Sequence, residues 1–161
     1  MKSVLTLLLF LIIGSVIADT LTHDIKVYRD PDCQCCHKWI THLENNQFNV
    51  IDVPTRNMAS VKAAIDLPKG IASCHTATIG GYIIEGHVPV ADIIRLLTEK
   101  PDIAGLSVPQ MPVGSPGMEM GSRKDNFAVM QFDRAGHYSV YNYYFVDEHN
   151  EYQSKKAEAT Q

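Results

Sequence analysis

Cys33-Gln34-Cys35-Cys36 is the stretch from which the fold can be predicted, because it holds three of the chain's four cysteines. The fourth opens the segment Cys74-His75-Thr76-Ala77. Cysteines confined to two short segments are typical of soft-metal binding or of thiol redox chemistry.

A purely structural disulfide pattern is disfavoured by geometry. Cys35 and Cys36 are adjacent, so their Cα atoms are about 3.8 Å apart, whereas disulfides join Cα atoms roughly 4.4–6.8 Å apart. Cys33 and Cys36 have the spacing of a redox CxxC pair, which would leave Cys35 with only Cys74. Two disulfides are therefore sterically cramped.

The flanking residues place the first cysteines at a strand-to-helix junction. Residues 25–28 alternate apolar and polar side chains, as a strand does, and residues 29–32 form a turn. A helix is predicted to begin near Cys35 or Cys36 and to end at Asn45-Asn46. Its apolar face has the spacing i, i+3, i+4 and i+7, formed by Cys36, Trp39, Ile40 and Leu43. A helix N-terminus favours thiolate over thiol.

The following elements complete a recognisable order. A strand is predicted over 48–53, a helix over 58–67 and a hairpin over 76–85 that turns at Gly80-Gly81. A third helix starts at Pro89 and ends before Pro101; its predicted apolar face is Val90, Ile93, Ile94 and Leu97. The order β-α-β-α-β-β-α predicts an α/β, thioredoxin-like domain. In that fold the segment before the third strand lies against the CxxC helix, so Cys74 is expected to face the other cysteines.

The predicted domain runs beyond this core. Residues 24–104 form the thioredoxin-like metal-binding core, and residues 105–146 extend the same domain. The extension begins with a Pro/Gly/Met-rich loop and continues with a β-hairpin whose strands are 127–132 and 138–146. The polar residues 147–161 are predicted to be a flexible tail.

Composition and the N-terminus bound the function. The chain has 161 residues, 45% hydrophobic and 20% charged, with a formal net charge of -4, which fits one globular domain and gives no sign of a nucleic-acid partner. Residues 1–18 have the charge, apolar run and cut site of a secretory signal peptide, giving Asp19 as the mature start. The run is shorter than the roughly 20 residues of a membrane span. We therefore expect a periplasmic protein without stable membrane insertion, in an oxidising compartment.

Several longer motifs resemble those of the CopG-type copper-resistance proteins, exported bacterial proteins long filed as a domain of unknown function. The resemblance covers about residues 25–120 and rests on the segments 28–36, 39–43, 74–77, 81–89 and 111–119. Gln34 and Gln110 stand where that family commonly has glycine.

The resemblance implies a thioredoxin-like domain that binds copper through the CxCC cysteines and the distal one. It further implies a cysteine-bridged copper cluster and a suggested role in interconverting Cu(I) and Cu(II).

The residue chemistry points to copper independently. Thiolates suit Cu(I) or Zn(II), but zinc sites favour wider spacing around one ion, whereas Cys-x-Cys-Cys favours sulfurs that bridge several ions. Four thiolates in one pocket carry four negative charges, and burying uncompensated charge costs several kcal/mol per ion. The sequence therefore predicts three or four Cu(I) ions, with His75 or water completing the coordination; the bridging ligands are Cys33, Cys35, Cys36 and Cys74.

Two alternatives stay open. One is a thioredoxin-type thiol-disulfide oxidoreductase using Cys33 and Cys36, against which Cys74 argues, because an extra facing thiol would trap mixed disulfides. The other is a copper carrier without redox activity. Whether the protein is an enzyme is open, and copper oxidoreductase is the candidate activity. Periplasmic copper carriers or exporters are the expected partners.

The histidines and methionines give weaker signals. His75 adjoins Cys74 and is the best further ligand; the others have structural interpretations, His42 as a core hydrogen-bonding partner, His87 as a cap or orienting group and His37 as a solvent-facing residue. Trp39 is predicted to be core. Met118 and Met120 are weak thioether candidates, with the filling of irregular core gaps as the rival interpretation.

Overall fold

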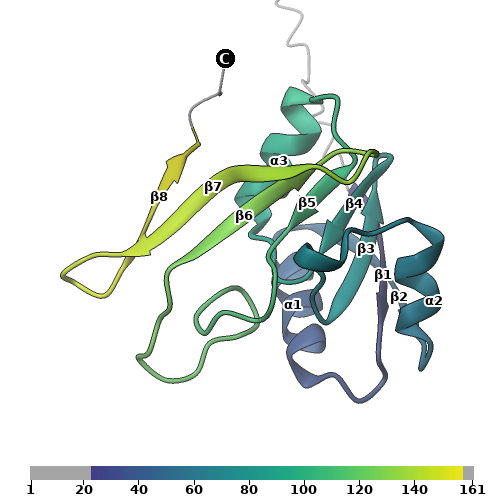
Figure 1. Cartoon of the computed structure of the whole chain (residues 1–161). Coiled ribbons are helices and arrows are strands. Elements are labelled where there is room, and N and C mark those ends of the chain that lie inside the picture. Colours follow the sequence, from purple (N-terminus) through teal and green to yellow (C-terminus); the bar gives the residue numbers. More distant parts are fainter. Residues whose placement is uncertain (1–22, 158–161) are drawn as a thin grey trace, which may run out of the picture.

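A computed structural model describes residues 23–157 (Figure 1), so the predicted signal peptide lies outside the described residues. The elements in chain order are β1 (His23–Arg29), α1 (Gln34–Asn45), β2 (Phe48–Pro54), α2 (Met58–Ala64), a 3-10 turn (Lys69–Ile71), β3 (His75–Ile79), β4 (Tyr82–Glu85), α3 (Val90–Glu99), β5 (Gly105–Ser107), β6 (Phe127–Phe132), β7 (Tyr138–Val146) and β8 (Tyr152–Lys156).

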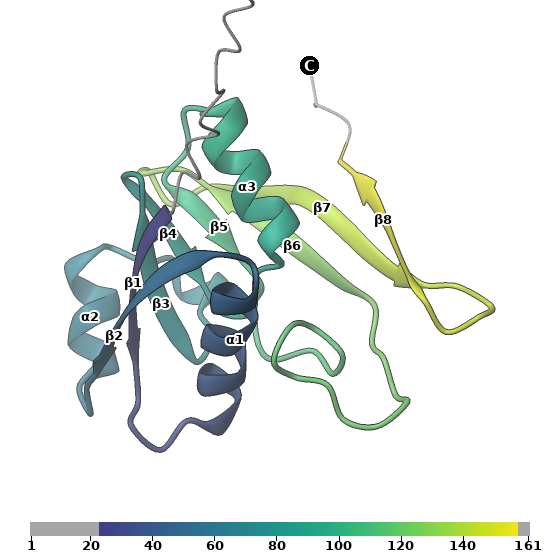
Figure 2. The same ribbon diagram turned by 180° about the vertical axis from the view of Figure 1, so that it is seen from behind.

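The described strands form one mixed eight-stranded sheet in the order β2-β1-β3-β4-β5-β6-β7-β8. β1 pairs in parallel with β2, and β4 with β5, while the other neighbours are antiparallel. Helices α1 and α3 cover one face of the sheet and α2 lies on the other (Figures 1 and 2). The protein is therefore a mixed α/β fold with three α-helices among the described residues.

The core lies between the sheet and the two helices α1 and α3. The predicted face of α1 is buried, and Trp39 is fully enclosed, as expected. Its indole Nε1–H donates a hydrogen bond of 3.0 Å to the carbonyl oxygen of Val88, so the ring is anchored as well as packed. Ile25 and Val27 of β1 lie in the same core. Full burial of one such aliphatic side chain contributes about 1.5–3 kcal/mol.

The structure places the hairpin and the last helix close to their predicted positions, with one difference in α3. Ile94 is 47% exposed, and Leu96 is fully buried in its place. α3 also turns Asp92 inward, because that carboxylate accepts hydrogen bonds from Asn142 (2.9 Å) and Tyr144 (2.8 Å) of β7. The helix is thus rotated so that Asp92 faces its polar partners on β7. The spacing of apolar residues in the sequence does not reveal such partners.

Two segments are more regular than predicted. β5 lies inside the Pro/Gly/Met-rich stretch, where Gly105 is required because a Cβ there would collide with the Ile83 carbonyl. Residues 152–156, predicted as part of a flexible tail, form β8 and pair with β7. That prediction was wrong because β8 is an edge strand with mostly exposed side chains, so it lacks alternating hydrophobicity.

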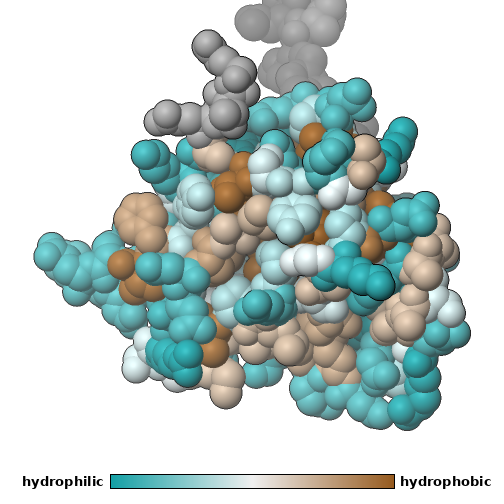
Figure 3. All heavy atoms as spheres, viewed as in Figure 1, coloured by the Kyte–Doolittle hydropathy of each residue, from teal (hydrophilic) through white to brown (hydrophobic). Residues whose placement is uncertain are grey.

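The surface carries a mixture of residue types. On the face shown in Figure 3, hydrophobic side chains form small groups separated by hydrophilic ones. Within residues 23–157, no helix is long and apolar enough to cross a membrane.

Candidate metal centre

The turn that leads into α1 is held by a buried arginine. The guanidinium of Arg29, which is 4% exposed, donates to the carbonyl oxygens of Asp30 (3.1 Å) and Pro31 (3.3 Å) and to the Asp52 carboxylate (2.6 Å). The backbone N–H of Cys33 donates to the Asp30 carbonyl at 3.1 Å. These bonds fix the point at which the chain enters the helix.

Cys33 is the N-cap residue of α1. Its Sγ accepts a hydrogen bond from the backbone N–H of Cys36 at 3.3 Å. The unpaired N–H groups and the partial positive charge at this end of the helix favour a thiolate at Cys33 whenever its sulfur is reduced.

The sheet register brings Cys74 to the same place. Arg29, the last residue of β1, pairs with His75, the first residue of β3. Cys74 therefore leaves the sheet beside the loop that carries Cys33, as the sequence predicted from the order of elements.

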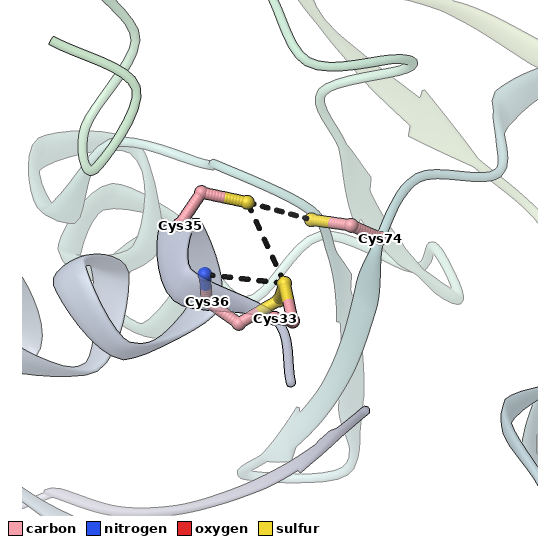
Figure 4. Close-up of side chains that lie close together, drawn as sticks. All are labelled: Cys33, Cys35, Cys36 and Cys74. Carbon is pink, nitrogen blue, oxygen red and sulfur yellow. Dashed lines mark hydrogen bonds between the residues drawn. A yellow bond between two sulfur atoms is a disulfide. The ribbon is translucent and has the colours of Figure 1, made fainter. Parts of the chain in front are cut away.

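All four cysteine sulfurs converge. The Sγ atoms of Cys33, Cys35, Cys36 and Cys74 lie within 4.8 Å of one another. Cys33 and Cys36 form a disulfide, with Cα atoms 5.4 Å apart, while Cys35 and Cys74 are free thiols. Cys35 Sγ lies 3.5 Å from Cys33 Sγ and 4.0 Å from Cys74 Sγ, and the two free thiols point toward one another (Figure 4).

Two buried histidines adjoin Cys74. Its Sγ lies 3.2 Å from Nδ1 of His75 and 3.1 Å from Nε2 of His87. The other nitrogen of His87, Nδ1, lies 2.8 Å from the carbonyl oxygen of Pro116. Since a carbonyl only accepts, Nδ1 of His87 carries the proton, and the lone pair of Nε2 faces Cys74. A backbone carbonyl that fixes the tautomer in this way is typical of metal-binding histidines.

Burial keeps Cys74 and its two histidine neighbours uncharged. Burial, followed by the neighbouring Cys35, raises the pKa of the Cys74 thiol to about 12. Burial also lowers the pKa of His87, and lowers that of His75 well below 6.5. At neutral pH Cys74 therefore keeps its proton and both imidazoles are uncharged, so a metal ion must displace the thiol proton, whereas the imidazole lone pairs need no deprotonation.

Comparison with solved structures identifies the family. A structure titled "Copper resistance protein copG- Form 2" is 48% identical, with a TM-score of 0.71, covering 74% of this chain and 95% of that one. A second, titled "Copper resistance protein copG- Form 1", is 50% identical with a TM-score of 0.69, over 73% of this chain and 93% of that one. The chain belongs to the CopG family. The family model "Protein of unknown function, DUF411" matches residues 71–118, and a search of curated proteins finds no match.

In this CopG-family chain the Pro/Gly/Met-rich loop packs directly on the start of α1. A Cβ on Gly117, whose φ is +84°, would lie 2.7 Å from the backbone nitrogen of Trp39 and 2.9 Å from the carbonyl oxygen of Cys35. Gln110 has a φ of +63°, in the left-handed region that glycine adopts freely.

A buried carboxylate organises the residues on either side of Cys74 and His75. Glu85 is fully buried and accepts hydrogen bonds from the backbone N–H of Ser73 and the hydroxyl of Thr76, both at 2.6 Å. Lys62 of α2 forms an ion pair with the same carboxylate and donates to Thr76 Oγ1 at 3.0 Å. The two residues that flank the Cys74-His75 pair are therefore anchored by one side chain.

The remaining methionine and histidine candidates lie outside the two groups of converging ligand atoms. Met120 is 63% exposed and Met118 is half-buried, so Met120 does not fill a core gap. His37 is exposed, as expected. Nε2 of His42 is buried without a hydrogen-bond partner among the described residues, and burial lowers the pKa of this imidazole.

His87 is the residue that sequence reasoning undervalued. A signal for it existed in the predicted hairpin: Ile79 pairs with Tyr82 and Thr76 with Glu85, so extending the register by two residues sets Cys74 opposite His87. A hydrogen bond from Gly86 N–H to the His75 carbonyl (3.0 Å) continues the pairing in that direction.

Proposed function

We propose that this protein is a periplasmic copper-binding protein of copper resistance that holds several Cu(I) ions in a thiolate cluster. The observation that carries the proposal is the convergence of four sulfurs, from two distant segments, in a chain of the CopG family. Copper is the cargo of this site. The donor set suits it, because thiolate and imidazole are the ligands that Cu(I) prefers.

We assign the domain to the thioredoxin-like class. The support is the order β-α-β-α-β-β-α over residues 23–99 and the strand order β2-β1-β3-β4, with β1 and β2 parallel and α1 and α3 on one face. In this arrangement the N-terminus of α1 and the residue before β3 meet beside the end of β1 and the start of β3, and the four cysteines lie there.

The number of ions follows from charge. With the Cys33–Cys36 disulfide reduced, four thiolates in a partly buried pocket carry four negative charges, and the helix N-terminus offsets only about half a charge. Four Cu(I) ions neutralise the pocket, and three do so with one thiol still protonated. Cys33, Cys35, Cys36 and Cys74 are the bridging ligands in this proposal.

His87 joins His75 as a nitrogen ligand at the edge of the cluster. Both imidazoles are neutral and both contact Cys74. Of the two, the His87 ring has its tautomer fixed by the carbonyl oxygen of Pro116, which leaves the lone pair on Nε2, toward Cys74. His87 is therefore the stronger nitrogen donor of the two, and Met118 and Met120 remain weaker proposals.

The test is anaerobic loading of the fully reduced protein with Cu(I). Bound copper should saturate above two ions per chain, and X-ray absorption should show short copper–copper distances. Cys74→Ser should lower the stoichiometry sharply, and His87→Asn should weaken retention against a Cu(I) chelator, whereas the exposed His37→Asn should match the unmodified protein. Saturation at a single ion without metal–metal scattering would overturn the cluster.

A second candidate function is supported by the disulfide itself. Cys33 and Cys36 form the bond expected of a thioredoxin-type thiol-disulfide oxidoreductase. Reduction of a disulfide-bonded peptide by the copper-free dithiol form, at a rate unaffected by Cys74→Ser, would favour that activity. Transfer of copper to a chelator without any change in thiol content would instead favour a carrier without redox activity.

The proposed export has its own test. Intact-mass analysis of exported protein should show Asp19 as the first residue.

A further inference from the structure

A β-bulge in β7 turns two neighbouring side chains toward α3. Val129 of β6 pairs with Asn142 and Met130 pairs with Val140, so Tyr141 has no residue opposite it in the ladder. Tyr141 and Asn142 are both buried, whereas the side chains of a regular strand alternate between its two faces. Bulges that re-aim a side chain in this way are frequent beside functional sites.

The two buried side chains meet different residues of α3. Asn142 donates to the Asp92 carboxylate, as described above. Tyr141 stacks against Arg95, whose guanidinium carbon lies 3.6 Å from the centre of the phenol ring. A terminal N–H of Arg95 also donates to the Tyr141 carbonyl oxygen at 3.1 Å. Tyr141 and Arg95 thus form a fixed pair that joins β7 to α3.

This pair leaves two hydrogen-bond donors unused. Within residues 23–157, neither the hydroxyl of Tyr141 nor Nε of Arg95 has a hydrogen-bond partner, although both atoms are buried. Burial raises the pKa of the Tyr141 hydroxyl, which therefore keeps its proton at neutral pH. A buried donor without an acceptor is destabilising and rare in proteins, so an acceptor supplied by a ligand would stabilise this place.

Both residues line a cavity between α3 and the C-terminal strands. Its volume is about 800 Å³, and small-molecule sites typically have roughly 300–1,000 Å³. Figure 2 shows β7 and β8 extending past α3, and residues of all three elements line the cavity. In the sheet order β4, β5 and β6 separate β7 from β3, so the cavity is distinct from the metal centre.

The lining of the cavity has a net positive charge. Arg95, Lys155 and Lys156 supply three cationic groups, and among the described residues Glu99 is the one carboxylate in the lining. Asp92 lies 3.7 Å from the Arg95 guanidinium but does not line the cavity. Arginine is the side chain best suited to bind carboxylates and phosphates. The positive charge therefore favours an anionic ligand.

Glu99 approaches Arg95 without bonding to it. Its Oε2 lies 4.0 Å from Nε of Arg95, beyond hydrogen-bond length, while its Oε1 accepts from Lys156 at 3.2 Å. The Glu99 side chain is 49% exposed, so it can move into solvent at little loss. An anion that replaced it beside Arg95 could approach more closely and satisfy the donor that Glu99 does not reach.

We propose that this cavity binds a small organic anion with an aromatic body. The anionic group displaces Glu99 and accepts the hydrogen bonds that Arg95 Nε and the Tyr141 hydroxyl do not make within the chain, and Lys155 adds electrostatic attraction. The aromatic body packs on the ring of Tyr143, which also lines the cavity. The class includes aromatic carboxylates and aryl phosphates. This inference goes beyond the proposed copper function and does not depend on it.

The experiment titrates the protein with benzoate and with phenyl phosphate, followed by the backbone amide resonances in nuclear magnetic resonance spectra. Benzamide is the ring without a charge, and inorganic phosphate is the anion without a ring. The two aryl anions should shift residues 139–143 and 155–157 in a saturable way, and should bind at least tenfold more tightly than either control compound.

A pair of matched variants tests the unused donor. Tyr141→Phe removes the buried hydroxyl and keeps the ring, so it should weaken benzoate binding at least fivefold without lowering the melting temperature. Tyr143→Phe makes the same change at a residue that is 47% exposed and should bind benzoate as the unmodified protein does. Glu99→Gln should strengthen binding, because a competing carboxylate is removed.

Three results would overturn the proposal. One is that neither aryl anion shifts residues 139–143 and 155–157, which would make the cavity a solvent-filled groove. Another is that benzamide binds as tightly as benzoate, and the third is that Tyr141→Phe and Tyr143→Phe have the same affinity. Cu(I) loading of Tyr141→Phe should equal that of the unmodified protein, so failure here leaves the proposed function intact.

Discussion

Replacing Lys62 by methionine tests whether the buried carboxylate next to the metal centre depends on its ion pair. Lys62 extends from α2, which fully buries none of its own residues, and its side chain is only 20% exposed. The Glu85 side chain is fully buried. Lys62→Met therefore leaves a carboxylate inside the protein with hydrogen bonds from Ser73 and Thr76 but without a counter-ion.

The magnitude follows from the environment of the pair. Removing one partner of a buried ion pair costs about 3–5 kcal/mol. Because Lys62 is at the edge of the protein, water replaces part of its contribution, and we expect the free energy of unfolding to fall by about 3 kcal/mol. In the double variant Lys62→Met/Glu85→Gln no charge is stranded, and the amide oxygen can still accept from the Ser73 N–H. The remaining loss should be about 1 kcal/mol, typical of one hydrogen bond.

The measurement is urea unfolding of the unmodified protein and of both variants, with Lys38→Met of α1 as the matched control. Lys38 is exposed, so its replacement should change stability by less than about 0.5 kcal/mol. The reasoning is refuted if Lys62→Met behaves like Lys38→Met, or if the double variant is no more stable than Lys62→Met alone. A loss of Cu(I) affinity that follows the same pattern would connect the carboxylate to the positions of Cys74 and His75.

Three further predictions concern the loop and the pH dependence of stability. Gly117→Ala should lower the melting temperature and alter the near-ultraviolet circular dichroism of Trp39, because the new Cβ would collide with the α1 backbone. The control is Gly121→Ala, which is also at positive φ but has no atom within 4 Å of the new Cβ, so it should leave that spectrum unchanged. Burial lowers the pKa of His75, so the unfolded state binds more protons below pH 6.5 and the free energy of unfolding should decrease as pH falls through that value; a shallower decrease in His75→Gln would confirm it, and an identical slope would contradict it. Burial raises the pKa of Asp92 above 3.8, so the folded state binds more protons and stability should fall as pH rises above that value, a slope that denaturation of Asp92→Asn should lack.

The elements with strong local signals were predictable from the sequence. α1 follows from the spacing of Cys36, Trp39 and Leu43, and the hairpin follows from Gly80-Gly81, whose φ values of +56° and +87° suit a tight turn. Once these elements are in order, the approach of Cys74 to the CxCC segment follows from how such strands pair.

The features that the sequence did not predict depend on contacts between distant residues or on the oxidation state of the cysteines. The ion pair of Lys62 with Glu85 joins α2, which has no fully buried residue, to the end of β4. No periodic pattern in the sequence encodes that contact. β8 exists because β7 offers it a partner. The oxidation state of Cys33 and Cys36 is a property of the environment, and the same four letters describe the dithiol and the disulfide.

The two halves of the sulfur cluster also differ in when they can form. Cys33 and Cys36 are separated by three positions, so their bond closes a very small loop, whereas Cys35 meets Cys74 across 39 positions and His87 meets Pro116 across 29. A chain that emerges N-terminus first thus presents its short-range sulfur pair well before the distal cysteine, and before the loop that covers α1. Early oxidation of that pair would protect an unfinished chain from capturing metal on its exposed thiols, and the complete ligand set would arise only after β3 has paired with β1.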